Sequence, residues 1–180
     1  MPRFVALFRA VNVGGTGKLS MRDLASLLER IEFTEVRTLL QSGNAVFDAP
    51  AKKPKALEIQ IENALTNRLG IQTDVVVRSV TDWRAVIAEN PFVREAELDP
   101  GRLTAALVKE DVTQESWKSL IAAIRGREII RGEARHGYIY YPDGQGNSKL
   151  TTTLIERKLG TRATIRNWNT VLKIDDALRS

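Results

Sequence analysis

The order of the apolar patterns constrains the fold of this chain most, because the same succession of strand-like and helix-like segments occurs twice. Short runs rich in β-branched and aromatic residues predict strands, and apolar residues three or four positions apart predict helices. In the first half, Ser20 and Pro54 stand where helices begin, and Gly70 stands where the second helix ends. The strands expected there are Arg3–Phe8, Glu35–Leu40, Ala45–Asp48 and Thr73–Arg78.

The second half repeats this order of elements without repeating its residues. Apolar positions predict one helix face at Trp117–Ile124 and another at Leu150–Leu159. Further helices are expected at Thr81–Asn90 and from Trp168 onward. We therefore predict an α+β protein of two tandem ferredoxin-like (βαββαβ) subdomains, residues 1–92 and 93–180, each followed by an extra helix. The strands expected in the second half are Leu103–Lys109, Glu128–Arg131, Tyr138–Tyr141 and Thr164–Arg166.

The composition excludes several classes of site. The chain has no cysteine, which rules out disulfides, thiolate catalysis and cysteine-ligated metals. His136 is the single histidine, so a histidine-rich metal site is impossible. A carboxylate-only site for a hard cation stays open, but we predict no metal site. No apolar run approaches the roughly 20 residues that span a bilayer, and no signal peptide is evident. We expect a cytoplasmic protein with no membrane partner.

The net charge of +5 favours anionic partners through long-range attraction, although it serves solubility equally well. It gives weight to four polar loops that combine glycine with amides, hydroxyls or cations.

The first polar loop follows the first strand and precedes a helix, which is the context of a phosphate-binding loop. The nucleoside-triphosphate pattern fails here, because it needs glycine at Asn12 and serine or threonine at Leu19. Glycines can still turn backbone N–H groups toward an anion, and Lys18 near a helix N-terminus favours negative charge. The alternative is a tight turn that needs positive φ. The candidate ligand-binding residues in this loop are Arg9, Asn12, Gly14, Gly15 and Lys18.

The second polar loop, Gln41-Ser42-Gly43-Asn44, fits two interpretations. Gly43-Asn44 predicts a type II′ hairpin, and the loop can be wholly structural. The amides of Gln41 and Asn44 and the hydroxyl of Ser42 could equally orient a ligand.

The other two loops lie in the second half. Ser148 and Lys149 close a glycine-rich loop, and Arg166 adds a forked donor just before the last helix. Asn167, Asn169 and Thr170 complete the candidate set, although either asparagine could simply cap that helix. We predict an anion contact at Arg166 and a core position for Trp168.

Strand polarity predicts that these loops gather in pairs. In a split βαβ sheet, Arg9–Lys18 should lie beside Gln41–Asn44 at one edge. By the same argument, Asp143–Lys149 should lie beside Arg166–Thr170 in the second half. If the two pairs face each other, they form one ligand cleft.

Two further patterns are possible sites. The tyrosines of the Tyr138–Tyr141 strand match the spacing of an RNA-recognition strand, but packing under a helix is favoured. The carboxylates show no paired spacing for acid–base catalysis, and no nucleophile motif occurs, so no catalytic residue is predicted.

Four ordered motifs extend over nearly the whole chain: Arg9-x-Val-Asn12-Val-Gly14-Gly15, Gln41-Ser42-Gly43-Asn44, Tyr141-Pro142-x-Gly144 with Ser148-Lys149-Leu150, and Thr164-x-Arg166-Asn167-Trp168-Asn169-Thr170. In these motifs the chain resembles an uncharacterised family catalogued as domain of unknown function 1697. Thr16-Gly17 departs from the polar or basic residue expected after the double glycine. The resemblance implies a mostly bacterial soluble protein and no particular activity.

Three functional hypotheses follow. The first is a binding protein for an anionic or phosphate-bearing ligand, a nucleotide or a nucleic acid. The second is an enzyme that acts on a phosphorylated or anionic small molecule, with a metal or the substrate supplying the missing base. The third is a protein-interaction module whose loops are purely structural. Cofactor and oligomeric state stay open.

Overall fold

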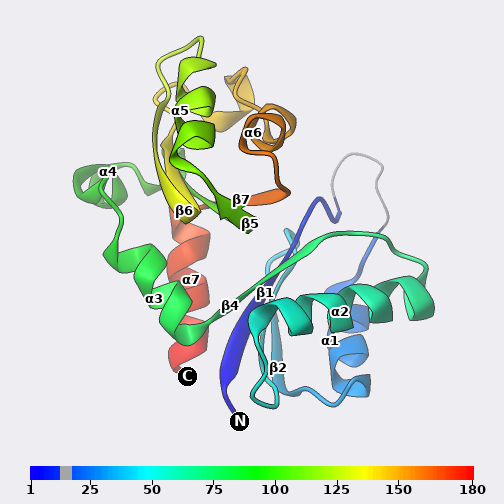
Figure 1. The fold of residues 1–180 in the computed structure, drawn as a ribbon. Coiled ribbons are helices and arrows are strands. Elements are labelled where there is room, and N and C mark those ends of the chain that lie inside the picture. The colour runs from blue at the N-terminus through cyan, green and yellow to red at the C-terminus, as the bar shows by residue number, and fades with distance from the viewer. Residues whose placement is uncertain (13–17) are drawn as a thin grey trace. The chain divides into compact units, whose positions relative to one another are not determined.

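The computed structural model describes residues 1–12 and 18–180, which form an α+β structure with two antiparallel sheets (Figure 1). The chain divides into two compact units: Met1–Arg84 with Ile174–Ser180, and Ala85–Lys173. The division falls inside helix α3 (Val80–Ala88), which follows its preceding strand without a break. Helix α7 (Trp168–Arg179) crosses the division a second time.

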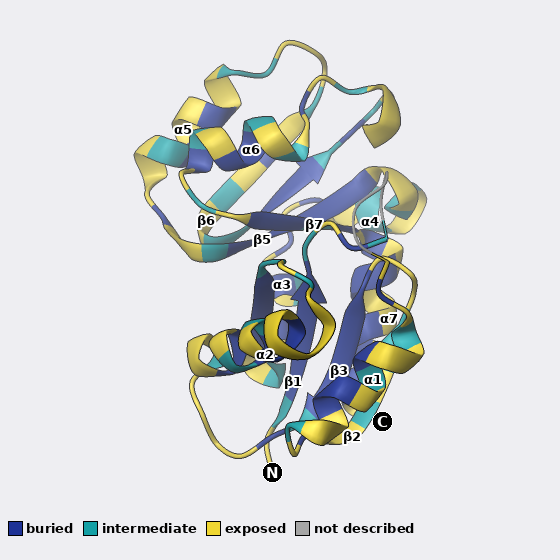
Figure 2. Cartoon of the chain, turned by 90° about the vertical axis from the view of Figure 1, so that its right-hand side faces the viewer, coloured by how far each residue is buried: buried dark blue, intermediate teal, exposed yellow. Residues whose placement is uncertain are grey.

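The first unit has the element order and the strand order that its sequence predicts. Its sheet runs β2-β3-β1-β4, with neighbouring strands antiparallel. Helices α1 and α2 pack on one face of this sheet, where Phe33 stacks on Phe47 with ring centroids 4.5 Å apart. Figure 2 shows the buried strands beneath the exposed outer faces of both helices. The elements are β1 (Arg3–Phe8), α1 (Met21–Arg30), β2 (Thr34–Leu39), β3 (Asn44–Asp48), α2 (Pro54–Leu69) and β4 (Val75–Ser79).

The turn between β2 and β3 differs from the predicted type II′ hairpin at Gly43-Asn44. Leu39 pairs with Asn44, so Asn44 already belongs to β3 and the loop has four residues, 40–43. Gly43 has φ +82°, and a Cβ there would lie 2.5 Å from Val11 Cγ2. Gly43 is a turn residue, as predicted, but the loop that contains it has four residues and not the two of a type II′ hairpin.

The second unit has a three-stranded sheet of order β6-β5-β7, so the predicted second βαββαβ is wrong in this detail. The two strands expected at Glu128–Arg131 and Tyr138–Tyr141 are parts of one long strand, β6 (Ile129–Tyr140). The other elements are α4 (Val93–Leu98), the short 3-10 helix η1 (Pro100–Arg102), β5 (Leu103–Val112), α5 (Gln114–Ala122), the short 3-10 helix η2 (Gln145–Asn147), α6 (Thr152–Leu159) and β7 (Ala163–Asn167).

Strand β6 stays continuous because its glycines make room for Trp117 and do not form a turn. A Cβ at Gly132 would lie 2.3 Å from the Trp117 ring, and one at Gly137 would lie 2.6 Å from it. Trp117 is 1% exposed and joins the core that α5 and α6 form on this face of the sheet. The irregularity in β6 is at Ala134, which has φ +48° and adjoins the register shift with β5.

Two of the three tyrosines in this segment are packed, as the favoured interpretation predicts, and the third, Tyr140, is half-buried. Tyr138 and Tyr141 are buried, and their hydroxyls donate to the carbonyls of Val86 (2.5 Å) and Leu150 (3.2 Å). Within the described residues, no helix combines the length and apolarity needed to cross a bilayer.

This packing predicts a loss of stability at alkaline pH. Burial raises the pKa of Tyr138 and Tyr141 above the ordinary value of about 10, so their phenols stay protonated in the fold. Unfolded tyrosines ionise near pH 10, so the stabilising contribution is complete below that pH and is lost as pH rises above it. Urea unfolding should therefore show that Tyr141→Phe has a free energy of unfolding about 1 kcal/mol lower than that of the parent protein at pH 8. This difference in stability should narrow above pH 10. A difference that stays constant would contradict this account.

Candidate functional site

The side chain of Asn12 holds the first loop together. Its Oδ1 accepts from the Leu19 N–H at 2.8 Å, and its Nδ2 donates to the Leu19 carbonyl at 2.8 Å and the Gln41 carbonyl at 3.1 Å. Asn12 also has φ +57°, a conformation that asparagine tolerates well. The structure thus brings the first two polar loops together, as expected. The Asn12 side-chain amide that joins them is hydrogen-bonded to the backbone of Leu19 and Gln41.

The remaining first-unit candidates are divided between the hairpin and the surface. Asn44 is fully buried, and its Nδ2 donates to the Leu39 carbonyl at 2.9 Å and the Ser42 hydroxyl at 3.1 Å. Arg9 is half-buried, and its backbone N–H donates to the Asp74 carbonyl at 3.0 Å. Gln41 and Lys18 are exposed. Gly14 and Gly15 lie outside the described residues.

Arg166 is a buried residue of β7. It is 7% exposed, and its Nη1 donates to Thr164 Oγ1 at 2.6 Å and to the Ile165 carbonyl at 3.1 Å. Burial lowers the pKa of its guanidinium to about 10. The guanidinium is therefore desolvated, and it donates two hydrogen bonds to residues of its own strand.

The residues after Arg166 begin helix α7. Asn167 Oδ1 accepts from the Thr170 N–H at 3.0 Å. This is the contact expected if Asn167 caps the helix, which is one of the two roles that the sequence allows. Asn169 is exposed and Thr170 is buried. Strands β6 and β7 are both antiparallel to β5, so the loops after them leave the same sheet edge with β5 between them. The two loops therefore share one edge of the sheet, as the sequence predicts.

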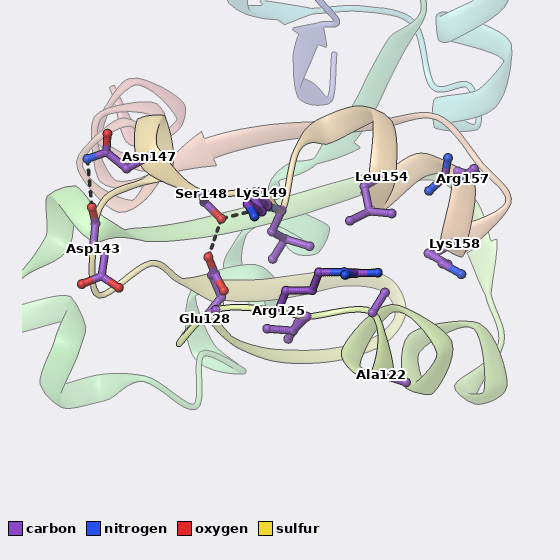
Figure 3. A pocket seen from close by; sticks show the side chains of 14 residues that line it. Ala122, Arg125, Glu128, Asp143, Asn147, Ser148, Lys149, Leu154, Arg157 and Lys158 are labelled. Atoms are coloured by element: carbon purple, nitrogen blue, oxygen red, sulfur yellow. Dashed lines mark hydrogen bonds between the residues drawn. The ribbon is translucent and has the colours of Figure 1, made fainter.

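Ser148 and Lys149, in contrast, line a cleft of about 780 Å³ within the second unit (Figure 3). One wall is the end of α5 with the loop that follows it, and the other walls are the 143–150 loop and α6. A cleft of this size is within the range of small-ligand sites. The lining residues that carry charge are Arg125, Glu128, Asp143, Lys149, Arg157 and Lys158.

Each carboxylate of the cleft contacts another protein group through at least one oxygen. Arg127 Nε donates to Asp143 Oδ2 at 3.0 Å, and this pairing lowers the pKa of Asp143. Ser148 Oγ donates to Glu128 Oε1 at 2.5 Å and accepts from the Leu150 N–H at 3.0 Å. Asp143 is therefore paired with a cation, whereas Glu128 is bound through Oε1 only, and its Oε2 is buried without a hydrogen-bond partner among the described residues.

The four cations of the cleft have no oppositely charged partner among the described residues. Among the described residues, no acidic side chain pairs with Arg125, Lys149, Arg157 or Lys158. Arg157 and Lys158 also stand in the last turn of α6, where they complement the helix dipole. The lining thus combines surplus positive charge with apolar surface, which includes Leu150 and Leu154.

Sequence reasoning found two of these lining residues and missed the others. Ser148 and Lys149 stood out because they follow a glycine-rich loop. Arg125, Arg157 and Lys158 belong to segments that only the fold brings together, and each alone looks like an ordinary surface cation. The local sequence signal for this site is the adjacent pair of cations, Arg157 and Lys158, in the last turn of α6.

The link between Ser148 and Glu128 should contribute to stability. We expect Ser148→Ala to lower the free energy of unfolding by about 1 kcal/mol, because it removes the donor to the carboxylate and the acceptor for Leu150. Chemical denaturation measures this. The nearby Asn147→Ala is a suitable control, because Asn147 is exposed and its one side-chain bond, to the Asp143 carbonyl, is long at 3.3 Å. Equal stabilities of the two variants would contradict the proposed link.

The comparisons with known proteins concern the chain as a whole. A solved structure of a conserved bacterial protein from Streptococcus pneumoniae has a TM-score of 0.77 at 20% identity and matches over 98% of both chains, which supports the fold. Translation initiation factor IF-2 of Microcystis aeruginosa is 27% identical over 146 residues, 74% of this chain, and the chain spans 13% of that protein's length. The model of the family described as protein of unknown function DUF1697 matches residues 1–138, and the chain belongs to this family.

Proposed function

We propose that the Ala85–Lys173 unit binds a phosphate-bearing or otherwise anionic ligand in the cleft between α5, the 143–150 loop and α6. One observation carries this proposal: four cations line the cleft without an acidic partner among the described residues, and they outnumber its two carboxylates, of which Asp143 is already paired with Arg127. A protein that used these cations only for solubility would have no need to gather them around a concavity.

The chemistry of the lining suits phosphate. Each hydrogen bond between a charged donor and a phosphate oxygen contributes about 1.5–3 kcal/mol, and arginine can contact two oxygens at once. Arg125 and Arg157 offer such forks, and Lys149 and Lys158 offer point charges. Leu150 and Leu154 give the uncharged part of a ligand an apolar surface. Nucleotides and nucleic acids both fit this description.

A thermal-shift screen at low salt tests the proposal. Pyrophosphate, nucleoside triphosphates and short oligonucleotides should stabilise the protein by about 1 kcal/mol at roughly five times the dissociation constant. Lys149→Ala should weaken the response. Lys118→Ala is the matched control, since Lys118 is an exposed cation of α5 that does not line the cleft. The absence of any response from all three compound classes would remove the proposal.

A further inference from the structure

We infer that Glu128 is a positioning residue of the cleft, which acts through Ser148 to hold the backbone that carries Lys149. This inference rests on the proposed function, because it concerns how the same cleft keeps a cation in place for an anionic ligand. It gives a carboxylate, which by its charge alone would oppose an anion, a supporting role in binding that requires no contact with the ligand.

The first support is the way the Ser148 hydroxyl bridges across Lys149. Its Oγ donates to Glu128 Oε1 at 2.5 Å (Figure 3) and accepts from the Leu150 N–H at 3.0 Å. Leu150 is buried in the core, and its carbonyl accepts from the Tyr141 hydroxyl at 3.2 Å. Lys149 itself is exposed, but the residues on both sides of it are held. The main chain at Lys149 is thus fixed by Glu128 on one side and by the core on the other.

The second support is the space that Gly126 leaves for the carboxylate. A Cβ at Gly126 would lie 2.6 Å from Glu128 Oε2 and 2.9 Å from Oε1, so any larger residue would displace the carboxylate. Oε2 is also buried without a hydrogen-bond partner among the described residues. A buried acceptor without a partner costs free energy, so the stability of the fold gives no reason for a carboxylate here. What Oε1 holds explains its place better.

The third support is that the preceding residue tethers the other end of the same loop. Arg127 Nε donates to Asp143 Oδ2 at 3.0 Å, and Asp143 begins the 143–150 loop. Both members of this pair are exposed, so salt screens their attraction. Glu128 and Ser148 are half-buried by comparison. Two adjacent residues therefore fix both ends of one wall of the cleft, and the less exposed link is the one beside a lining cation.

A comparison of two variants separates positioning from charge. If only the charge of Glu128 mattered, Glu128→Ala and Glu128→Gln would bind pyrophosphate equally, because both lose the same negative charge. Glutamine keeps an oxygen that can accept from Ser148, and alanine does not. We expect Glu128→Ala to bind pyrophosphate roughly three- to tenfold more weakly than Glu128→Gln, because a loosened Lys149 must be ordered on binding. Isothermal titration calorimetry at low salt measures both affinities.

Gly126→Ala tests the same link without changing any charge. The three atoms nearest to its methyl group would all belong to the Glu128 carboxyl group, which can turn away at little cost to stability. This displacement should weaken pyrophosphate binding by a similar factor, and should have no further effect when it is combined with Glu128→Ala. Gly101→Ala is the matched control, since a Cβ there meets no atom within 4 Å and Gly101 does not line the cleft.

The outcomes separate the two levels of the account. Equal affinities of Glu128→Ala and Glu128→Gln, or an unchanged affinity in Gly126→Ala, would overturn the inference and leave the proposed function intact. Should Glu128→Ala fail to fold, the result with Gly126→Ala decides alone. A parent protein that binds no pyrophosphate, nucleoside triphosphate or oligonucleotide would remove the inference together with the proposed function.

Discussion

Replacing Arg157 and Lys158 together by glutamate should lower the affinity of the cleft for phosphate-bearing ligands by more than about a hundredfold. The lining now carries four cations and two carboxylates, and the double variant would carry two cations and four carboxylates. Two charge-assisted hydrogen bonds of about 1.5–3 kcal/mol each would be lost, and each 1.4 kcal/mol is a factor of ten. Isothermal titration calorimetry with the best ligand from the screen measures the loss.

This substitution needs two controls, because glutamate in the last turn of α6 also opposes the helix dipole. The double glutamine variant removes the charges without this repulsion and should lose affinity while keeping its stability close to that of the parent. Lys118→Glu adds the same kind of charge change outside the cleft and should leave affinity within about a factor of two. An unchanged affinity in the double glutamate variant would exclude the cleft as the binding site.

Gly132→Ala should lower the free energy of unfolding of the second unit by about 3 kcal/mol, near the upper end of the usual cost of overpacking. The new Cβ would lie 2.3 Å from the Trp117 ring, which is buried at 1% exposure and has no room to retreat. Chemical denaturation measures the effect. Gly101→Ala is the matched control, since no atom lies within 4 Å of a Cβ placed there.

A double-mutant cycle shows whether Trp117 is the cause. Trp117→Leu alone should destabilise by a few kcal/mol because it leaves a cavity. Combined with Gly132→Ala it should cost clearly less than the sum, because the smaller side chain leaves space for the methyl group. Additive losses would mean that Gly132 is needed for a reason other than contact with Trp117.

The first unit could be predicted because its signals are local. Ser20 caps α1 by accepting from the Asp23 N–H at 3.0 Å, and α2 ends at Leu69, directly before Gly70. The succession of short strands and helices then leaves few ways to order the sheet. In the second unit, the glycines of β6 look like strand breaks in the sequence, and only the Trp117 side chain from another element explains why the strand continues.

Only part of the candidate site could be predicted, because the sequence does not show which groups a polar side chain contacts in the fold. A sequence does not distinguish an amide that serves the backbone from one that serves a ligand, and Asn12 and Asn44 both hydrogen bond to their own loops. Arg166 was singled out for its position before a helix, but alternation along β7 turns it into the protein. The cleft cations form no pattern that is visible in the sequence, because they lie in three separate segments that come together only in the fold.

The most direct test of the central claim is a map of where an anion binds. Pyrophosphate titrated into the ¹⁵N-labelled protein at low salt should shift the backbone amide signals of residues 122–128, 143–150 and 154–158, in the three segments that line the cleft. Shifts confined to the loops around Asn12 and Gln41, or no shifts at saturating pyrophosphate, would contradict the account.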